Sequence, residues 1–251
     1  MGGRGVAGAR PTMPVAERFV SINGEGVRAG RLAAFVRFAG CNLACSYCDT
    51  RWVNEPDCPV DYYEAGAIAA WARSTGAACV TLTGGEPLLQ PQLCALVRAL
   101  LDDDGESPAL GGGKSPVSFV EIETNGAVDV TDVARLRKEL GERGCGHVGL
   151  TMDYKLPSSG MERAMLCGNF SYLTSDDTVK FVAGSPEDLD VALRVMREHD
   201  LCGRCAVYLS PVFGELGPSD LVDFVRDNRL ADVTVQLQMH KIIWPDAETG
   251  V

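Results

Sequence analysis

The 251-residue sequence has few basic residues, few histidines and no long apolar run. Its hydrophobic stretches fall short of the about 18 consecutive apolar residues that span a bilayer, which argues against a membrane protein. Residues 1–13 also lack the apolar segment of a secretory signal. Lysine and arginine number 23 against 34 aspartate and glutamate residues, and the net charge of −11 argues against non-specific nucleic-acid binding. We therefore expect a cytoplasmic globular protein with neither a membrane nor a nucleic-acid partner.

Cysteine, by contrast, is abundant, with 10 residues in the chain. Disulfide bonds are rare in the cytosol, so a cytosolic chain has no evident structural use for so many thiols. The sequence contains no recognisable catalytic triad. The cysteines are therefore the first candidates for functional residues.

Short apolar segments typical of buried strands alternate along the chain with amphipathic segments typical of helices. The predicted strands are Ala33–Phe38, Cys79–Thr83, Val117–Glu123, His147–Asp153, Thr178–Val182, Ala206–Ser210 and Val233–Leu237. The predicted helices are Asp61–Ser74, Pro91–Leu101, Thr131–Leu140, Pro186–Glu198 and Pro218–Asn228. Because parallel strands need helix-length connections, this alternation predicts an α/β fold with a mainly parallel sheet. Closing eight strands takes about 250 residues, so we expect an incomplete, TIM-like (β/α)6 barrel.

We predict a single domain over residues 14–251. Residues 1–13 are rich in glycine, alanine and arginine and are expected to form a flexible leader. The acidic, glycine-rich segment Asp102–Ser115 is expected to be a surface loop without a chemical role. Ser185-Pro186-Glu187 has the N-cap residue, the proline and the acidic residue that are typical of a helix start.

Cys41, Cys45 and Cys48 form a C-x3-C-x2-C motif directly after the predicted strand Ala33–Phe38. In parallel barrels, the loops at the C-terminal strand ends carry the active site. Structural zinc sites use four protein ligands, whereas three thiolates leave a coordination position open. The motif therefore favours a four-iron cluster with one exchangeable iron. The alternative is a set of incidental cysteines that happen to have this spacing.

This motif, with Tyr47 before its last cysteine, resembles that of the radical S-adenosylmethionine (SAM) superfamily. The resemblance implies a [4Fe–4S] cluster whose open iron binds SAM and which cleaves it to methionine and a 5′-deoxyadenosyl radical. Three more motifs of the superfamily end predicted strands: TGGEP at 83–87, whose glycines would let a ligand approach the backbone, EIETNG at 121–126 and DYK at 153–155. The SAM-binding residues implied by position are Tyr47, Gly84, Gly85, Glu86, Glu123, Asn125, Asp153 and Lys155. Some members have Ser-Pro-Lys in place of DYK.

More specific motifs narrow the resemblance to the 7-carboxy-7-deazaguanine synthase family. They are SINGEG at 21–26, CDT at 48–50, SPVFG at 210–214 and QMHK at 238–241. The resemblance covers the chain from Pro14 onward, apart from the acidic loop. It implies the conversion of 6-carboxy-5,6,7,8-tetrahydropterin to 7-carboxy-7-deazaguanine with loss of ammonia, in 7-deazapurine (queuosine-type) biosynthesis.

The family resemblance also implies substrate-binding residues. A carboxylate at Glu25 can accept paired hydrogen bonds from the 2-aminopyrimidinone edge of a pterin, and the planar guanidinium of Arg31 suits its carboxylate. The implied substrate-binding residues are Ile22, Asn23, Gly24, Glu25, Arg31, Thr83, Gln238, His240 and Lys241. Thr50 is implied to bind Mg2+ through its hydroxyl, a hard oxygen ligand; alternatively, it caps a turn.

The implied partners are the small pterin substrate, an electron donor of flavodoxin or ferredoxin type and a second copy of the chain in a homodimer. Two alternatives stay open: an enzyme that generates a glycyl radical on a partner protein, and a non-catalytic metal-binding module, which would need a fourth protein ligand.

Seven cysteines lie outside the motif. Cys79 and Cys94 fall on apolar positions and are expected to pack as small hydrophobic residues. Cys202 and Cys205 form a C-x2-C pair, but two further zinc ligands are not evident nearby. The carboxylate of Val251 is a further candidate for contact with the substrate.

Overall fold

The computed structural model describes residues 11–102, 117–247 and 249–250. Within them, nine strands form one sheet in the order β3-β1-β2-β4-β5-β6-β7-β8-β9. The strands are β1 (Met13–Ile22), β2 (Leu32–Phe38), β3 (Asp61–Tyr63), β4 (Cys79–Gly84), β5 (Phe119–Thr124), β6 (His147–Tyr154), β7 (Thr178–Ala183), β8 (Ala206–Pro211) and β9 (Val233–Val235). The helices are α1 (Ala65–Ser74), α2 (Leu93–Leu101), α3 (Thr131–Arg143), α4 (Pro186–Glu198), α5 (Pro218–Asp227) and α6 (Met239–Ile243).

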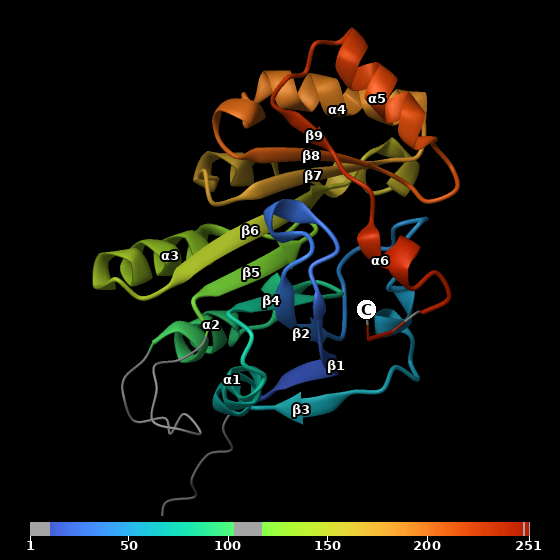
Figure 1. Cartoon of the computed structure of the whole chain (residues 1–251). Coiled ribbons are helices and arrows are strands. Elements are labelled where there is room, and N and C mark those ends of the chain that lie inside the picture. Colours follow the sequence, from blue (N-terminus) through green and yellow to red (C-terminus); the bar gives the residue numbers. More distant parts are fainter. Residues whose placement is uncertain (1–10, 103–116, 248, 251) are drawn as a thin grey trace, which may run out of the picture.

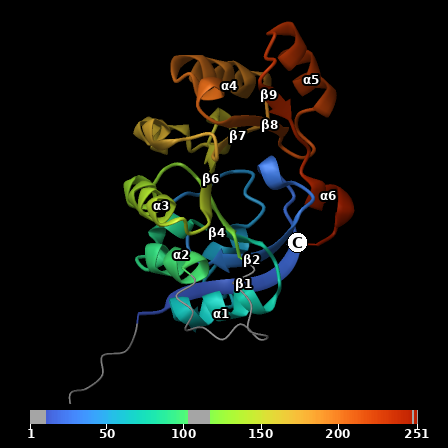
Figure 2. The same cartoon turned by 60° about the vertical axis from the view of Figure 1, so that its left-hand side comes forward.

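Strands β2 and β4 to β9 are parallel to one another. Their crossovers place α1 to α5 on the outer face of the curved sheet, as Figures 1 and 2 show. Only the connection from β6 to β7 lacks an α-helix, and it consists of 3-10 turns instead. The α/β prediction is therefore confirmed. The described sheet is open at β3 and β9 and has seven parallel strands, one more than the predicted (β/α)6 barrel. The incomplete barrel itself stays a prediction.

Two antiparallel strands that the sequence did not predict extend the sheet beyond β2. β1 pairs with β2, and β3 pairs with β1. Met13, which the sequence analysis places in the leader, is instead the first residue of β1 and is fully buried. The rest of the predicted leader up to residue 10, and the predicted loop after Asp102, lie outside the described residues. The helix predicted from Asp61 begins at Ala65 instead, because the residues before it pair with β1.

The two faces of the sheet bury different kinds of side chain, because successive residues of a strand point to opposite faces. The outer face packs against the helices in the main apolar core, which includes Phe38, Leu82 and Ile122. A smaller apolar cluster on the inner face includes Phe35 and, as predicted, the buried Cys79. Apart from this cluster, the inner face carries the polar and charged groups of the site.

The start of α4 follows its predicted capping pattern. The Ser185 hydroxyl accepts a hydrogen bond from the backbone N–H of Asp188 at 3.2 Å, and Pro186 is the first helical residue. No helix in the described part of the chain has the length and apolar character needed to cross a membrane.

Segment 23–31, which joins β1 to β2, crosses the inner face of the sheet. Ile22 ends β1, and the Asn23 side chain then reaches β4 and β5. The backbone N–H of Gly26 donates to Gln236 Oε1 at 2.6 Å, just after β9. The segment is therefore held at one end by β4 and β5 and further along by the residue after β9. It lies beside the inner face of the sheet (Figure 1) and forms one wall of the site described next.

Candidate cluster and substrate site

The cluster loop, residues 39–50, follows β2 and is anchored to distant parts of the chain. The backbone N–H of Ser46 donates to the Ser159 carbonyl at 3.1 Å, in the segment after β6. The Tyr47 hydroxyl donates to the Val182 carbonyl of β7 at 3.2 Å. Tyr47, predicted to bind SAM, thus also anchors the cluster loop to β7.

Cys41, Cys45 and Cys48 influence one another electrostatically. Burial raises the pKa of the Cys45 thiol; Lys155 opposes this effect, and the other two cysteines add to it. The backbone N–H of Leu43 donates to Cys41 Sγ at 3.4 Å, and bonds of this kind tune bound clusters. All three thiols are free. Thiolates are the usual ligands of iron–sulfur clusters, and three of them would leave one iron of a four-iron cluster open.

Gly84 and Gly85 lie against the backbone of the cluster loop. The N–H of Gly85 donates to the Phe38 carbonyl at 3.0 Å. A Cβ on Gly85 would overlap the Gly40 carbonyl and lie 2.9 Å from Cys41 N, and a Cβ on Gly84 would overlap the Phe38 backbone. The sequence suggested that these glycines admit a ligand, whereas the close approach in the structure is made by the protein's own cluster loop. Their contact with SAM stays a prediction.

Glu86 is fully buried, and both of its carboxylate oxygens accept hydrogen bonds within the protein. Oε1 accepts from the Leu88 N–H at 3.0 Å and the Thr124 hydroxyl at 2.9 Å, and Oε2 accepts from the Asn125 N–H at 2.7 Å. Burial raises the pKa of Glu86, and these hydrogen bonds oppose that effect. The Asn125 amide donates in turn to Cys41 Sγ at 3.5 Å. Glu86 thereby ties the loops after β4 and β5 to the cluster loop, and its role toward SAM stays a prediction.

Four charged residues form a chain on the inner face beside the cluster loop. Lys180 of β7 lies 2.7 Å from Glu25 Oε2 and 3.7 Å from Asp153 Oδ2, and Lys155 lies 2.9 Å from the same Asp153 oxygen. Burial alone would lower the pKa of both lysines, but the neighbouring carboxylates raise it in each case. Glu25, Asp153 and Lys155 were predicted from the sequence, and the structure brings them together around Lys180, which was not.

A buried hydrogen-bond network deeper in the sheet fixes the start of segment 23–31. The Thr81 hydroxyl donates to Asn23 Oδ1 at 2.9 Å, and Asn23 Nδ2 donates to Glu121 Oε2 at 3.2 Å. The Thr151 hydroxyl donates to the other Glu121 oxygen at 2.7 Å. Burial, with the nearby charge of Glu123, raises the pKa of Glu121 to about 7. The predicted substrate residue Asn23 is thus held by β4 and β5, and β6 in turn holds Glu121.

The end of the cluster loop meets helix α6. The Thr50 hydroxyl donates to Asp49 Oδ1 at 2.9 Å, and Asp49 Oδ2 lies 3.8 Å from His240 Nε2 and 3.5 Å from Lys241 Nζ. Burial would raise the pKa of Asp49, but these contacts hold it well below its usual range. The α6 backbone also donates to the Gly24 carbonyl at 3.2 Å. Helix α6 therefore connects the cluster loop to the predicted substrate segment.

The side chain of the predicted arginine, Arg31, is exposed, and its backbone carbonyl accepts a hydrogen bond from the Asn23 N–H at 2.9 Å. Arg31 therefore lies beside the start of the predicted substrate segment, and its contact with the pterin carboxylate stays a prediction. Arg37, near the C-terminal end of β2, pairs in register with Thr83 and lies 2.6 Å from Glu17. The sequence analysis did not single out Arg37, because its strand was interpreted as an apolar run; the two-residue period of the strand indicates that Arg37 faces the inner side of the sheet. Gln238 is the N-cap residue of α6.

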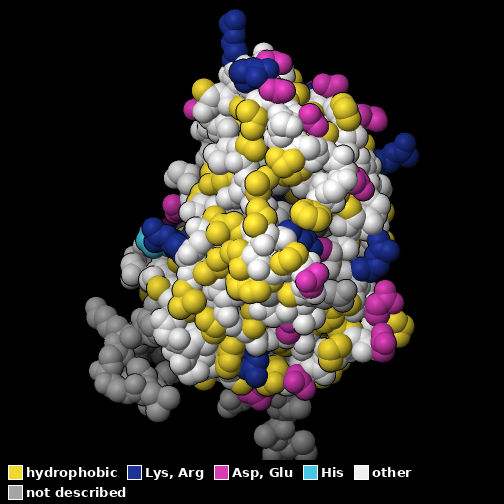
Figure 3. All heavy atoms as spheres, turned by 45° about the vertical axis from the view of Figure 1, so that its right-hand side comes forward, with side chains coloured by type: hydrophobic (Ala, Val, Ile, Leu, Met, Phe, Trp, Pro, Cys, Tyr) yellow, Lys and Arg dark blue, Asp and Glu magenta, His cyan; other side chains and the backbone are white. Residues whose placement is uncertain are grey.

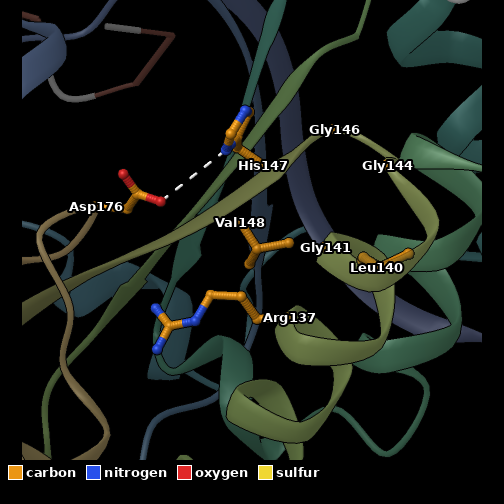
Figure 4. Close-up of a pocket in the computed structure, with 8 residues that line it drawn as sticks. All are labelled: Arg137, Leu140, Gly141, Gly144, Gly146, His147, Val148 and Asp176. Carbon is orange, nitrogen blue, oxygen red and sulfur yellow. Dashed lines mark ion pairs between the residues drawn. The ribbon is translucent and has the colours of Figure 1, made fainter.

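A separate hollow of about 230 Å³ lies between α3 and the start of β6, at the opposite ends of the strands (Figure 4). Arg137 lines it, but its guanidinium already donates to both Asp177 oxygens at 2.6 and 2.7 Å and to the Tyr172 carbonyl at 2.6 Å. His147 lies 4.0 Å from Asp176. The hollow is thus remote from the cluster loop, and its arginine is already paired.

Comparisons with known proteins agree with this arrangement. The radical SAM superfamily profile matches residues 35–154, which run from β2 to the end of β6. The 7-carboxy-7-deazaguanine synthase of Clostridium acetobutylicum is 44% identical over 94% of this chain and 98% of its own length. That of Chlorobaculum tepidum is 35% identical over 93% and 95%. The crystal structure of QueE from Escherichia coli shares the fold with a TM-score of 0.63 at 18% identity, over 91% of this chain and 95% of that one.

The two synthases match 94% and 93% of the chain. Superfamily membership implies a [4Fe–4S] cluster and SAM as cofactors, and the three thiols fit such a cluster. The chain belongs to the 7-carboxy-7-deazaguanine synthase family of the radical SAM superfamily.

Proposed function

We propose that this chain converts 6-carboxy-5,6,7,8-tetrahydropterin to 7-carboxy-7-deazaguanine with loss of ammonia, as a cytoplasmic step of 7-deazapurine (queuosine-type) biosynthesis. The observation that carries the proposal is the charged chain of Glu25, Lys180, Asp153 and Lys155 beside the three thiols of the cluster loop. The names of relatives that match nearly the full length support the same reaction.

When bound, the cluster and SAM supply the radical chemistry that starts the ring contraction. The residues of the chain bind and orient the two ligands. Asp153 and Lys155, beside Cys45, offer an acceptor and a cation to the charged groups of SAM's methionine part. Glu25 offers a carboxylate oxygen to the N–H donors of the pterin ring. For the pterin carboxylate the proposed partner is Arg31, whose backbone is held beside Asn23, since the guanidinium of Arg37 is already paired with Glu17 at 2.6 Å.

We further propose that Thr50 binds Mg2+. A threonine hydroxyl can bind a metal ion through its oxygen while donating its proton, and Thr50 already donates to Asp49 Oδ1. Replacing Thr50 with alanine should weaken the response of turnover to Mg2+ by about 10- to 100-fold, with the iron content unchanged. A titration of turnover against Mg2+ measures this, with the exposed Thr234→Ala of β9 as the control. An unchanged Mg2+ titration in Thr50→Ala would contradict the role.

Two partners belong to the same proposal. An electron donor of flavodoxin or ferredoxin type would reduce the cluster near the exposed Cys48. A second copy of the chain would form a homodimer. Hydrophobic side chains gather on the face shown in Figure 3, and α6 and the residue after it contribute the exposed or half-exposed Ile242, Ile243 and Trp244, which provide apolar surface for such a contact.

Anaerobic incubation of the reconstituted protein with SAM, a reductant and 6-carboxytetrahydropterin tests the reaction. We expect 7-carboxy-7-deazaguanine and ammonia in equal amounts, identified by mass spectrometry. Cleavage of SAM without a deazaguanine product would instead favour the glycyl-radical alternative. Cluster binding without any cleavage of SAM would favour the non-catalytic module.

A further inference from the structure

Lys180 stands on β7, between a residue predicted to bind substrate and one predicted to bind SAM. Its side chain is almost fully buried, at 13% exposure. It lies 2.7 Å from Glu25 Oε2, which belongs to segment 23–31, and 3.7 Å from Asp153 Oδ2 on β6. One lysine therefore contacts carboxylates from two separate parts of the site.

Each of these carboxylates leaves its second oxygen without a partner. Glu25 Oε1 and Asp153 Oδ1 are buried and have no hydrogen-bond partner in the described part of the chain. A buried carboxylate oxygen without a donor is costly, and such atoms are uncommon unless a ligand or an ordered water supplies the donor. The lysine thus fixes one oxygen of each carboxylate and leaves the other available to a ligand.

The surroundings make this lysine electrostatically necessary. Glu25, Asp153 and Glu123 all raise its pKa. Lys155 pairs with Asp153, whereas Lys180 is the lysine in contact with Glu25. The charge of Lys180 also acts on the pKa of four further groups, which are Tyr47, Asp49, Glu121 and Lys155. His240 lies next to Gly24, the neighbour of Glu25. Without Lys180, Glu25 would lie buried beside other acids with no cation in contact, so its carboxylate would be neither compensated nor held in one orientation.

We propose that Lys180 is a positioning residue for substrate recognition: it holds Glu25 as an oriented carboxylate whose free oxygen accepts hydrogen bonds from the N–H donors of the pterin ring. This inference rests on the proposed function, because it takes a pterin as the ligand of Glu25. Lys180 itself does not contact the reacting atoms. The same lysine braces Asp153, so it aligns the substrate side and the SAM side of the site together.

Equilibrium binding of 6-carboxypterin, followed by its fluorescence, tests the role without turnover. The wild-type protein, with cluster and SAM bound, is compared with Lys180→Met, Lys180→Arg and the exposed control Lys138→Met of α3. We expect Lys180→Met to bind about 10- to 100-fold more weakly at pH 6, Lys180→Arg to restore most of the affinity, and the control to match the wild type.

A double variant separates positioning from packing. If Lys180 acts on the ligand through Glu25, adding Lys180→Met to Glu25→Gln should cause no further loss of affinity. Additive losses in the double variant, or a Lys180→Arg variant that binds as weakly as Lys180→Met, would overturn the inference alone. A wild-type protein that does not bind 6-carboxypterin would overturn the proposed function with it.

Discussion

Replacing Cys45 with alanine is expected to abolish the iron–sulfur cluster and to reduce turnover to the background of cluster-free protein. Cys45 is the buried member of the three cysteines, and it stands between Cys41 and Cys48 in the loop. With one thiolate missing, only two protein ligands remain for a cluster that already has an iron without a protein ligand. Iron and sulfide analysis after anaerobic reconstitution measures the loss, together with the visible absorption of the cluster.

The chain supplies a matched control for this prediction. Cys58 follows the cluster loop, and its thiol donates to the neighbouring Pro59 carbonyl at 3.5 Å. Cys58→Ala should therefore keep the full iron content and turnover. Because cysteine packs as a small hydrophobic residue, Cys45→Ala should keep the fold, which circular dichroism can verify. Full iron content in Cys45→Ala would show that another residue completes the site and would remove the basis for the assigned ligands.

The parallel part of the fold was predictable because its signals are local. Each parallel strand is an apolar run followed by a helix or by turns, and the crossover requirement then fixes the parallel pairing. Strand β1 escaped prediction because its pattern is not apolar on either face. Phe19 stacks on Phe35 with ring centroids 4.8 Å apart, while Glu17 pairs with Arg37 on the same inner face. Its identity as a strand depends on these partners, which are distant in sequence.

The site was predictable where motifs mark it and not where the fold completes it. The three cysteines, Glu25, Asp153 and Lys155 could be placed by their motifs. Lys180 could not, because it lies within the apolar run Thr178–Val182 and its contact with Glu25 joins residues that are 155 positions apart in sequence. Glu86 shows the reverse case, since its motif suggested a ligand contact and the structure adds an internal hydrogen-bond network.

The glycines of the TGGEP motif lead to the second large effect. Gly85→Ala is expected to lower the free energy of unfolding by about 3 kcal/mol or more, and to displace the cluster loop in whatever protein still folds. The added methyl group would meet the Gly40 carbonyl and lie 2.9 Å from Cys41 N. Both neighbours are backbone, so no side-chain rotation relieves the overlap. The hydrogen bond from Gly85 N–H to the Phe38 carbonyl, now 3.0 Å, would stretch as the loop moves away.

Urea unfolding and iron content measure the two consequences together, and Gly66→Ala is the matched control. Gly66 lies on the exposed side of α1, and a Cβ there would meet nothing within 4 Å. The control should gain about 0.5–1 kcal/mol, because alanine loses less conformational freedom than glycine in a helix. If instead Gly85→Ala kept its stability and its iron but bound SAM more weakly, the predicted packing role would be wrong, and the glycine would be needed to let SAM approach the backbone. Loss of iron together with loss of stability would show that the two glycines hold Cys41 in place by bringing two backbones together.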